Sequence, residues 1–185
     1  MSHQQPQSIL EELPGDLMIW VLIISELLVF GAGLAAFLAV RMTDPTGFAE
    51  AQTHLHSTGA ALNTIVLVSS GYLAARALQF RRVSRRTAAR YAVVAAAALG
   101  VVFLVIKGIE YGDKAGQGIT YETHPFFTFY YLLTGFHAAH VVAGIVLLLL
   151  VAWRDEVGNI EIAGAFWHMV DLVWVLLFPV IYVLA

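Results

Sequence analysis

Five ionisable side chains lie within stretches of this sequence that are otherwise apolar. They are Glu26, His137, His140, His168 and Asp171. An ionisable group near the middle of a membrane span costs about 2.5–3.5 kcal/mol on insertion scales, so such groups face protein or water and find partners. Imidazoles and carboxylates can bind a metal, exchange protons or hydrogen-bond between helices. The elements that carry these residues decide between the three roles.

The stretches around these residues are long enough to cross a membrane. The chain has 185 residues, of which 59% are hydrophobic and 12% charged, whereas soluble domains carry about 25% charged residues. A helix needs about 20 apolar residues to cross the hydrocarbon core. Five segments qualify, at about residues 17–40, 60–80, 91–109, 126–152 and 162–184. We therefore predict an all-α membrane protein, a bundle of five transmembrane helices that forms one domain over residues 1–185 and begins with a polar segment, 1–16.

A cluster of arginines indicates the orientation of these spans. The segment "RRVSRRTAAR" (81–90) joins the second and third spans and contains five arginines. Loops rich in Lys and Arg stay on the cytoplasmic side, which predicts a cytoplasmic N-terminus and a periplasmic C-terminus. We interpret the cluster as a contact for lipid headgroups rather than for nucleic acid, because the net charge of the chain is −3.

The depths of the five polar residues place them close together along the membrane normal. At a rise of about 1.5 Å per residue, Glu26 and Asp171 lie about 14 Å from the cytoplasmic ends of their spans, His140 about 18 Å and His137 about 22 Å. His137/His140 and His168/Asp171 each share a helix face, because they are three residues apart. We expect one inward-facing polar layer. Small residues would let these helices approach closely, namely Gly31, Ala35, Gly135 and Gly144.

Three roles remain open for this layer. Hydrogen bonds across helices would fix the register of the bundle, which is the interpretation we favour. Proton handling is compatible with it, because burial away from water favours the protonated form of a carboxylic acid such as Glu26. Metal or haem ligation is disfavoured, since carboxylate-bridged two-metal bundles use Glu-x-x-His pairs from two helices and His137 and His140 lie on one helix. The chain has no cysteine, which excludes thiolate sites. We predict neither catalytic residues nor metal ligands here.

Five motifs follow one another along the chain. They are "IISELLVFGAGLAAF" (23–37), "LNTIVLVSSG" (62–71), "IEYGDK" (109–114), "FFTFYYLLTGFHAAHVVAG" (126–144) and "FWHMVDLVWVLLFPVIY" (166–182). Together they resemble subunit III of the haem-copper oxidase superfamily, from about residue 15 to the end. In this resemblance Glu26 takes the place of a membrane carboxylate of the family. Other motif positions are expected to shape helix packing, namely Asn63, Glu110, Tyr111, Gly135, Trp167 and Trp174.

The resemblance implies a non-catalytic subunit of the bacterial inner membrane. Such a subunit packs beside a catalytic subunit, binds membrane phospholipid, and supports the stability, assembly and proton uptake of its partner during electron transport. This chain is then expected to bind no cofactor itself, and haem with copper or iron belongs to the partner.

The choice of partner is open. Five-span chains of this kind resemble both subunits of cytochrome c or quinol oxidases and accessory proteins of nitric oxide reductase in denitrification. The short chain, "DPTGF" (44–48), "LNTIVLVSS" (62–70) and the pair Tyr130–Tyr131 favour the nitric oxide reductase branch slightly. An alternative from another class is an independent proton or small-solute carrier built around Glu26, although carriers commonly show inverted repeats and broken helices that this sequence does not suggest.

Overall fold

The computed structural model describes residues 17–154 and 157–184. Every regular element in these residues is a helix. They run in the order α1 (Leu17–Arg41), α2 (Pro45–Thr53), α3 (Ser57–Arg82), α4 (Arg86–Gly116), α5 (Pro125–Arg154) and α6 (Val157–Tyr182). The predicted polar segment 1–16 lies outside the described residues.

Five of these helices are long and apolar enough to cross a membrane, which confirms the predicted fold class. α1 and α5 agree with the predicted spans within two residues at each end, whereas α3, α4 and α6 begin three to five residues earlier. α4 also continues to Gly116, beyond the predicted end at residue 109. The extensions contain arginine, lysine and glutamate, which are good helix formers but do not belong to the hydrocarbon-spanning stretch that hydropathy detects.

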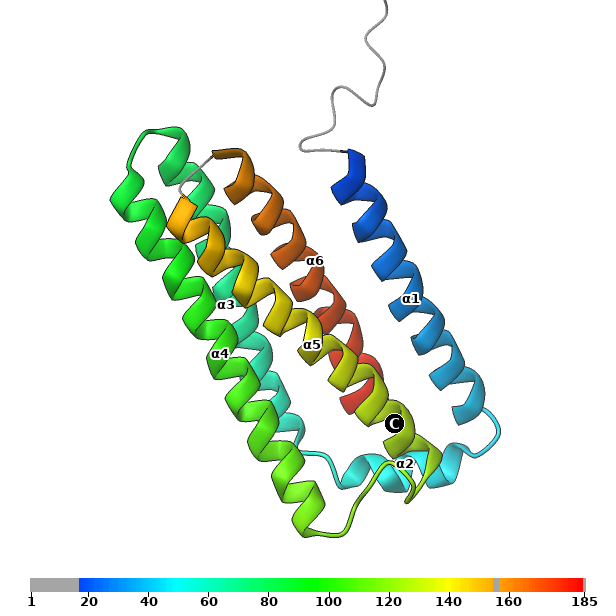
Figure 1. The fold of residues 1–185 in the computed structure, drawn as a ribbon. Coiled ribbons are helices and arrows are strands. Elements are labelled where there is room, and N and C mark those ends of the chain that lie inside the picture. Colours follow the sequence, from blue (N-terminus) through cyan, green and yellow to red (C-terminus); the bar gives the residue numbers. More distant parts are fainter. Residues whose placement is uncertain (1–16, 155–156, 185) are drawn as a thin grey trace, which may run out of the picture.

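Four helices form a closely packed bundle, and α1 stands at its side (Figure 1). α3 and α4 are antiparallel neighbours, while α6 packs against both α3 and α5. α1 packs on α5 and α6. Within α1, Phe30 and Phe37 are the buried side chains, whereas large apolar residues such as Val21 and Leu28 are exposed. α1 therefore offers most of its surface to lipid.

The short helix α2 was not predicted from hydropathy, because it does not span the membrane. Asp44 is its N-cap and accepts a hydrogen bond from the Gly47 N–H at 3.1 Å, and Pro45 occupies the first helical position, where proline is favoured. Gln52 Nε2 donates to the carbonyl oxygen of Ile181 at 2.9 Å. α2 thus lies across the end of the bundle where α6 finishes (Figure 1).

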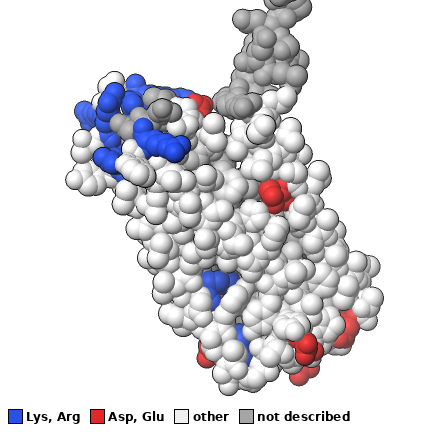
Figure 2. Space-filling model, in the orientation of Figure 1, with Lys and Arg blue, Asp and Glu red and all other residues white. Residues whose placement is uncertain are grey.

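The two ends of the bundle differ in charge. Lys and Arg side chains gather at the end that holds the α3–α4 loop, and Asp and Glu side chains lie mainly at the opposite end (Figure 2). α1 begins at the arginine-rich end and α6 finishes at the opposite end. The predicted orientation requires this placement, because it puts the N-terminus and the C-terminus on opposite sides of the membrane. The assignment of the arginine-rich end to the cytoplasm stays a prediction.

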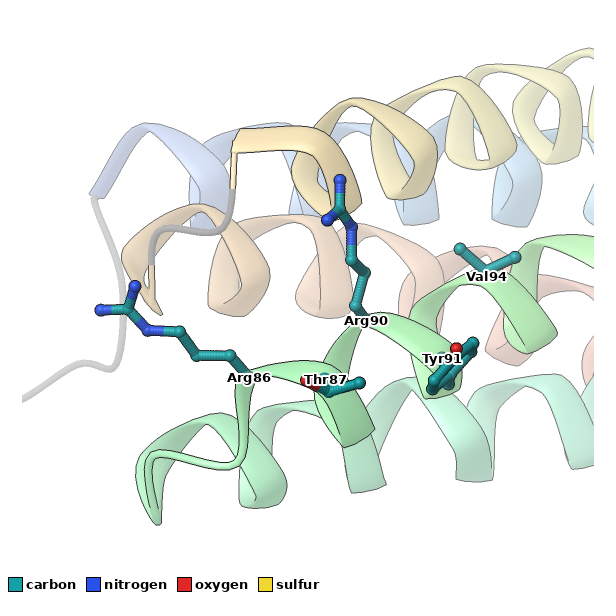
Figure 3. A pocket seen from close by; sticks show the side chains of 5 residues that line it. All are labelled: Arg86, Thr87, Arg90, Tyr91 and Val94. Atoms are coloured by element: carbon teal, nitrogen blue, oxygen red, sulfur yellow. The ribbon is translucent and has the colours of Figure 1, made fainter.

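A surface hollow lies at the arginine-rich end of α4. It is lined by Arg86, Thr87, Arg90, Tyr91 and Val94 (Figure 3). Two guanidinium groups, a tyrosine and an apolar wall are the chemistry expected where a helix passes through the headgroup region. This arrangement is compatible with the predicted contact between the arginine cluster and lipid headgroups.

Candidate functional site

Glu26 and His140 form the contact between α1 and α5 that the sequence suggested. Glu26 Oε2 and His140 Nε2 lie 3.1 Å apart, and the two side chains are 23% and 14% exposed. The other ring nitrogen of His140, Nδ1, lies 2.9 Å from the carbonyl oxygen of Phe136. Because that carbonyl fixes one nitrogen, the ring presents its second nitrogen to Glu26.

His137 does not join this pair. It is fully buried, and its ring lies 5.2 Å from the ring of Trp174 and 5.5 Å from that of Phe103 between centroids. Neither of its ring nitrogens has a hydrogen-bond partner within the described residues. His137 therefore packs as a flat ring among aromatic side chains, and the placement on one helix face with His140 does not bring it to Glu26.

His168 and Asp171 form a second polar pair on α6, close to α3. His168 Nδ1 and Asp171 Oδ2 lie 3.9 Å apart, and the side chains are 47% and 12% exposed. Gly71 of α3 makes room for Asp171, because a Cβ atom at that position would collide with the carboxylate. The second carboxylate oxygen, Oδ1, is buried and has no hydrogen-bond partner in the part of the chain that the structure describes.

The prediction of one inward-facing layer is therefore wrong. The five residues fall into a Glu26–His140 pair, a separately packed His137, and a His168–Asp171 pair whose histidine is exposed. Spacing within a helix shows which residues share a face, but it does not show how each helix is rotated against its neighbours. Among the described residues, no three His, Asp or Glu side chains lie close enough together to hold a metal ion.

Trp167 is central to the packing of α6 in the bundle interior. Its indole fills the space left by Gly100 of α4 and Gly144 of α5, because a Cβ atom at either glycine would come within 2.7 Å or less of the ring. The indole Nε1 donates to Ser70 Oγ of α3 at 3.0 Å, and that hydroxyl donates to the carbonyl oxygen of Ala96 at 2.7 Å. The expected role of Gly144 in close packing is confirmed.

Trp174 and Asn63 make further hydrogen bonds between these helices, closer to the C-terminal end of α6. Trp174 Nε1 donates to Thr64 Oγ1 at 2.9 Å, and Asn63 Nδ2 donates to the carbonyl oxygen of Phe103 at 3.3 Å. Both residues are buried. These motif positions join α3 to α6 and to α4, as expected of residues that shape helix packing.

Other small residues pack less closely than expected. Gly31 and Ala35 of α1 are exposed, and no atom lies within 4 Å of the place where a Cβ would stand on Gly31. A Cβ on Gly135 would meet the Tyr111 hydroxyl at an ordinary 3.7 Å. Gly33 is the glycine of α1 that packs closely, because a Cβ there would lie 2.6 Å from a methyl carbon of Leu133. The close-packing prediction was therefore wrong for Gly31 and Ala35.

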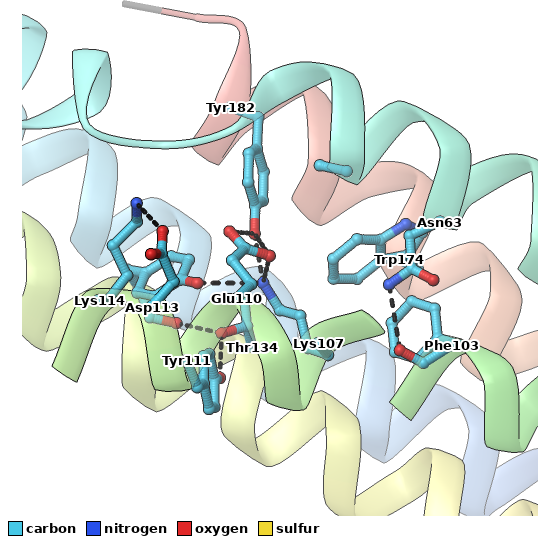
Figure 4. A network of polar contacts seen from close by, with 12 residues as sticks. Asn63, Phe103, Lys107, Glu110, Tyr111, Asp113, Lys114, Thr134, Trp174 and Tyr182 are labelled. Atoms are coloured by element: carbon cyan, nitrogen blue, oxygen red, sulfur yellow. Dashed lines mark hydrogen bonds and ion pairs between the residues drawn. The ribbon is translucent and has the colours of Figure 1, made fainter. Parts of the chain in front are cut away.

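The sequence analysis missed a buried network around Lys107 (Figure 4). Lys107 is 2% exposed, and its Nζ donates to Glu110 Oε2 at 2.9 Å. It also donates to the hydroxyls of Tyr182 and Tyr130. Tyr182 in turn donates to Glu110 Oε1 at 2.9 Å. The ammonium group therefore meets a carboxylate and two phenols, and α4, α5 and α6 are joined at one point.

Aromatic rings complete the surroundings of Lys107. Its Nζ lies 4.7 Å from the ring centre of Tyr130 and 5.0 Å from that of Tyr182, within the range of cation–π attraction. Beside this group, the hydroxyl of Tyr111 and Oγ1 of Thr134 on α5 share a hydrogen bond of 2.5 Å. The sequence offered one signal for this network, the i, i+3 spacing of Lys107 and Glu110 near the end of a span.

Comparisons with known proteins show the family of this chain. The chain matches the family model for cytochrome c oxidase subunit III over residues 14–185. It is 30% identical to a cytochrome c oxidase subunit 3 of Synechocystis, with 88% of this chain and 72% of that protein covered. For the subunit 3 of Thermostichus vulcanus the identity is 32%, with 89% and 84% covered. For that of Arabidopsis thaliana it is 33%, with 65% and 48% covered. The chain therefore belongs to the cytochrome c oxidase subunit III family of the haem-copper oxidases.

Proposed function

We propose that this chain is a non-catalytic integral membrane subunit of a respiratory haem-copper oxidase. It would bind the catalytic subunit and support its stability, assembly and proton uptake during electron transport. The observation that carries this proposal is the family match over residues 14–185, together with relatives of which the alignment covers 72% and 84%. In this proposal, haem and copper belong to the catalytic partner, and the chain resides in the bacterial inner membrane.

The positions of the motif residues support a structural role. Trp167 and Trp174 fill the interior between α3, α4, α5 and α6 and each donates a hydrogen bond to a side-chain hydroxyl. Glu110 forms an ion pair with Lys107 and accepts a hydrogen bond from Tyr182. Side chains held in this way keep helices in register, and a rigid bundle can hold a neighbouring subunit in place.

Glu26 and His140 are the best candidates for a part in proton uptake. Their carboxylate and imidazole groups lie 3.1 Å apart, and both are groups that can take up and release protons. Both side chains are partly exposed, so the pair lies at the edge of the packed interior. The pair would buffer protons beside the partner and would not itself carry out the redox reaction.

A second candidate is an accessory protein of a nitric oxide reductase, whose catalytic subunit holds haem and iron. The "DPTGF" segment and the pair Tyr130–Tyr131 favour it, whereas the relatives cited above are cytochrome c oxidase subunits and give this branch no support. An independent carrier is weaker still. The spanning helices run unbroken in the described residues, so they present no half-helix ends to a solute near Glu26.

The test is affinity purification of the tagged chain from native membranes in digitonin. Co-purifying chains are identified by mass spectrometry, and haem is read from reduced-minus-oxidised spectra. A copper-containing oxidase catalytic subunit supports the proposal, and a nitric oxide reductase catalytic subunit with haem and non-haem iron supports the second candidate. Recovery of the chain without either partner would contradict both, and proton or solute transport by the pure chain in liposomes would then favour a carrier.

A further inference from the structure

One face of α6 exposes polar groups halfway along the helix. His168 and Asp171 lie about 17 and 21 Å from the start of a helix of 26 residues, which is about 39 Å long at 1.5 Å per residue. The His168 side chain is 47% exposed at this level. Lipid tails offer no hydrogen-bond partner there, and such polar groups are unfavourable unless protein or water covers them.

The hydrogen bonding of Asp171 is also incomplete. Its Oδ1 is buried and lacks a partner within the described residues, and its Oδ2 lies 3.9 Å from His168 Nδ1, which is too long for a hydrogen bond. Glu110 provides the contrast, because both of its carboxylate oxygens accept hydrogen bonds. The buried Oδ1 is out of reach of a neighbouring chain, whereas Oδ2, beside the exposed His168 ring, also lacks a hydrogen-bond donor in the described residues and is open to one from outside.

The surroundings of this pair are apolar and exposed. On α6, Leu172, Val175 and Leu176 follow His168 at helical spacing and are 47%, 43% and 47% exposed. They therefore form one face with it. The exposed face of α4 has a similar share of apolar surface, for example Val101 at 48% and Val105 at 55%. Because no ionisable side chain interrupts that stretch of α4, lipid can cover it without cost.

We propose that the α6 face formed by His168, Leu172, Val175 and Leu176 is the docking surface for a transmembrane helix of the catalytic subunit. That helix would present a hydrogen-bond donor, such as an amide, a hydroxyl or a basic group, at the level of Asp171. The inference rests on the proposed function and specifies which face of the chain meets the partner.

Two other occupants fit this face less well. A phospholipid places its polar headgroup about 15 Å from the midplane, too far to donate to Asp171. A second copy of the chain, related by a two-fold axis, would meet the same patch on itself. It would then cover the face with the same Leu172, Val175 and Leu176 side chains, which donate no hydrogen bond. A donor on the helix of a different chain satisfies the carboxyl group and covers the imidazole.

Site-specific photo-crosslinking in the native membrane tests the location. Benzoylphenylalanine is placed at Leu172 or at Val175, and the control is Val101 of α4, which is as exposed as Leu172. We expect at least tenfold more adduct with the catalytic subunit from the two α6 positions than from the control. Equal yields, a higher yield from Val101, or adducts only with lipid or with a second copy of this chain would overturn the proposal.

Variants of Asp171 test the chemistry. Asp171→Asn keeps hydrogen-bonding capacity and should retain the catalytic subunit in the purified complex within about twofold of the wild type. Asp171→Leu removes that capacity and should reduce retention at least tenfold, with helix content and melting temperature of the free chain unchanged. Where Asp171→Leu fails to fold, Val175→Trp takes its place, because it enlarges the docking face without touching the interior. Full retention by Val175→Trp would overturn the proposal.

The outcomes separate this inference from the proposed function. If the wild-type chain purifies without a catalytic subunit, the proposed function fails and the docking face falls with it. If the wild type retains the subunit while crosslinks arise from Val101 instead of Leu172, the proposed function stands and the docking face alone is wrong.

Discussion

α1 and α3 show how differently two membrane-spanning helices can be used in one chain. α1 has the higher mean hydropathy, yet only Phe30 and Phe37 among its 25 residues are buried. α3 is less apolar, but it buries Asn63, Ser70 and Gly71 along with four apolar residues. In a bilayer, apolar side chains gain little from leaving lipid, whereas small and hydrogen-bonding residues gain from meeting another helix. The more polar helix is therefore the better packed one.

The polar groups of the two regions differ in the same way. Glu26 of α1 forms an ion pair with His140. Lys107, in the closely packed bundle, meets Glu110, Tyr130 and Tyr182 at once. The first arrangement joins α1 to α5 through one pair, and the second holds three helices together. We therefore expect substitutions in the Lys107 network to affect folding, and substitutions at Glu26 to affect function more than folding.

The largest effect is expected for Lys107→Met. This change leaves Glu110, whose side chain is 10% exposed, without its cation, and loss of one member of a buried ion pair costs about 3–5 kcal/mol. The measurement is thermal unfolding in detergent, followed by circular dichroism. The control is the double variant Lys107→Met/Glu110→Gln, which removes both charges and should recover much of the loss. An unfolding temperature of the single variant equal to that of the wild type would show that water reaches the site.

Gly144→Val should have the next largest effect. A side chain there collides with the Trp167 ring, and overpacking of a filled interior costs about 1–3 kcal/mol. Gly31→Val is the matched control on α1, where a Cβ has no neighbour within 4 Å. We expect a lower unfolding temperature for Gly144→Val and little change for Gly31→Val. Equal losses for both variants would contradict the difference in packing between α1 and the bundle.

Glu26→Gln is expected to leave folding and assembly nearly intact. The amide is close in shape to the carboxylic acid and can still bond to His140, so the change in unfolding free energy should stay within about 1 kcal/mol. Oxidase turnover and proton uptake of the purified complex are the readouts for function. A loss of stability as large as that of Lys107→Met would break the comparison, because it would show that Glu26 is charged and structurally essential.

The spans were predictable from sequence because hydrophobic length is a local property. Each predicted span lies within or close to a helix of the structure, and the i, i+3 spacing of His168 and Asp171 does place them side by side on α6. Glu26 and His140, predicted at similar depths, are in contact, although Glu26 and Asp171, predicted at the same depth, belong to separate pairs. The depth of a residue along the membrane normal can be calculated by counting residues from the end of its helix. Depth can therefore be predicted from the sequence.

Rotation of one helix against another was not predictable in this way. His137 and His140 share a face by spacing, yet His137 meets Trp174 and His140 meets Glu26. Lys107 was missed because a lysine near the end of a span reads as an interfacial cation. Its burial depends on Tyr130 and Tyr182, which lie 23 and 75 residues further along the chain. Such contacts are decided by the packing of whole helices.

The smallest predicted effect concerns the cap of α2, outside the membrane spans. The Gly47 N–H, followed by the contact with His124, lowers the pKa of Asp44 below its usual 3.8. The ionised form therefore stabilises the fold at pH values above about 4, and this contribution is lost as the pH falls through the lowered pKa. Asp44→Asn caps the helix as well as aspartate does but cannot ionise. We expect the wild type to melt slightly above this variant at about pH 6 and this difference to shrink as the pH falls below about 4, both measured in detergent. Asp44→Ala also loses the cap, so its melting temperature should stay below that of the wild type as the pH falls. If the difference in melting temperature between the wild type and Asp44→Asn grew on acidification, the carboxylate would not be stabilised in the folded chain.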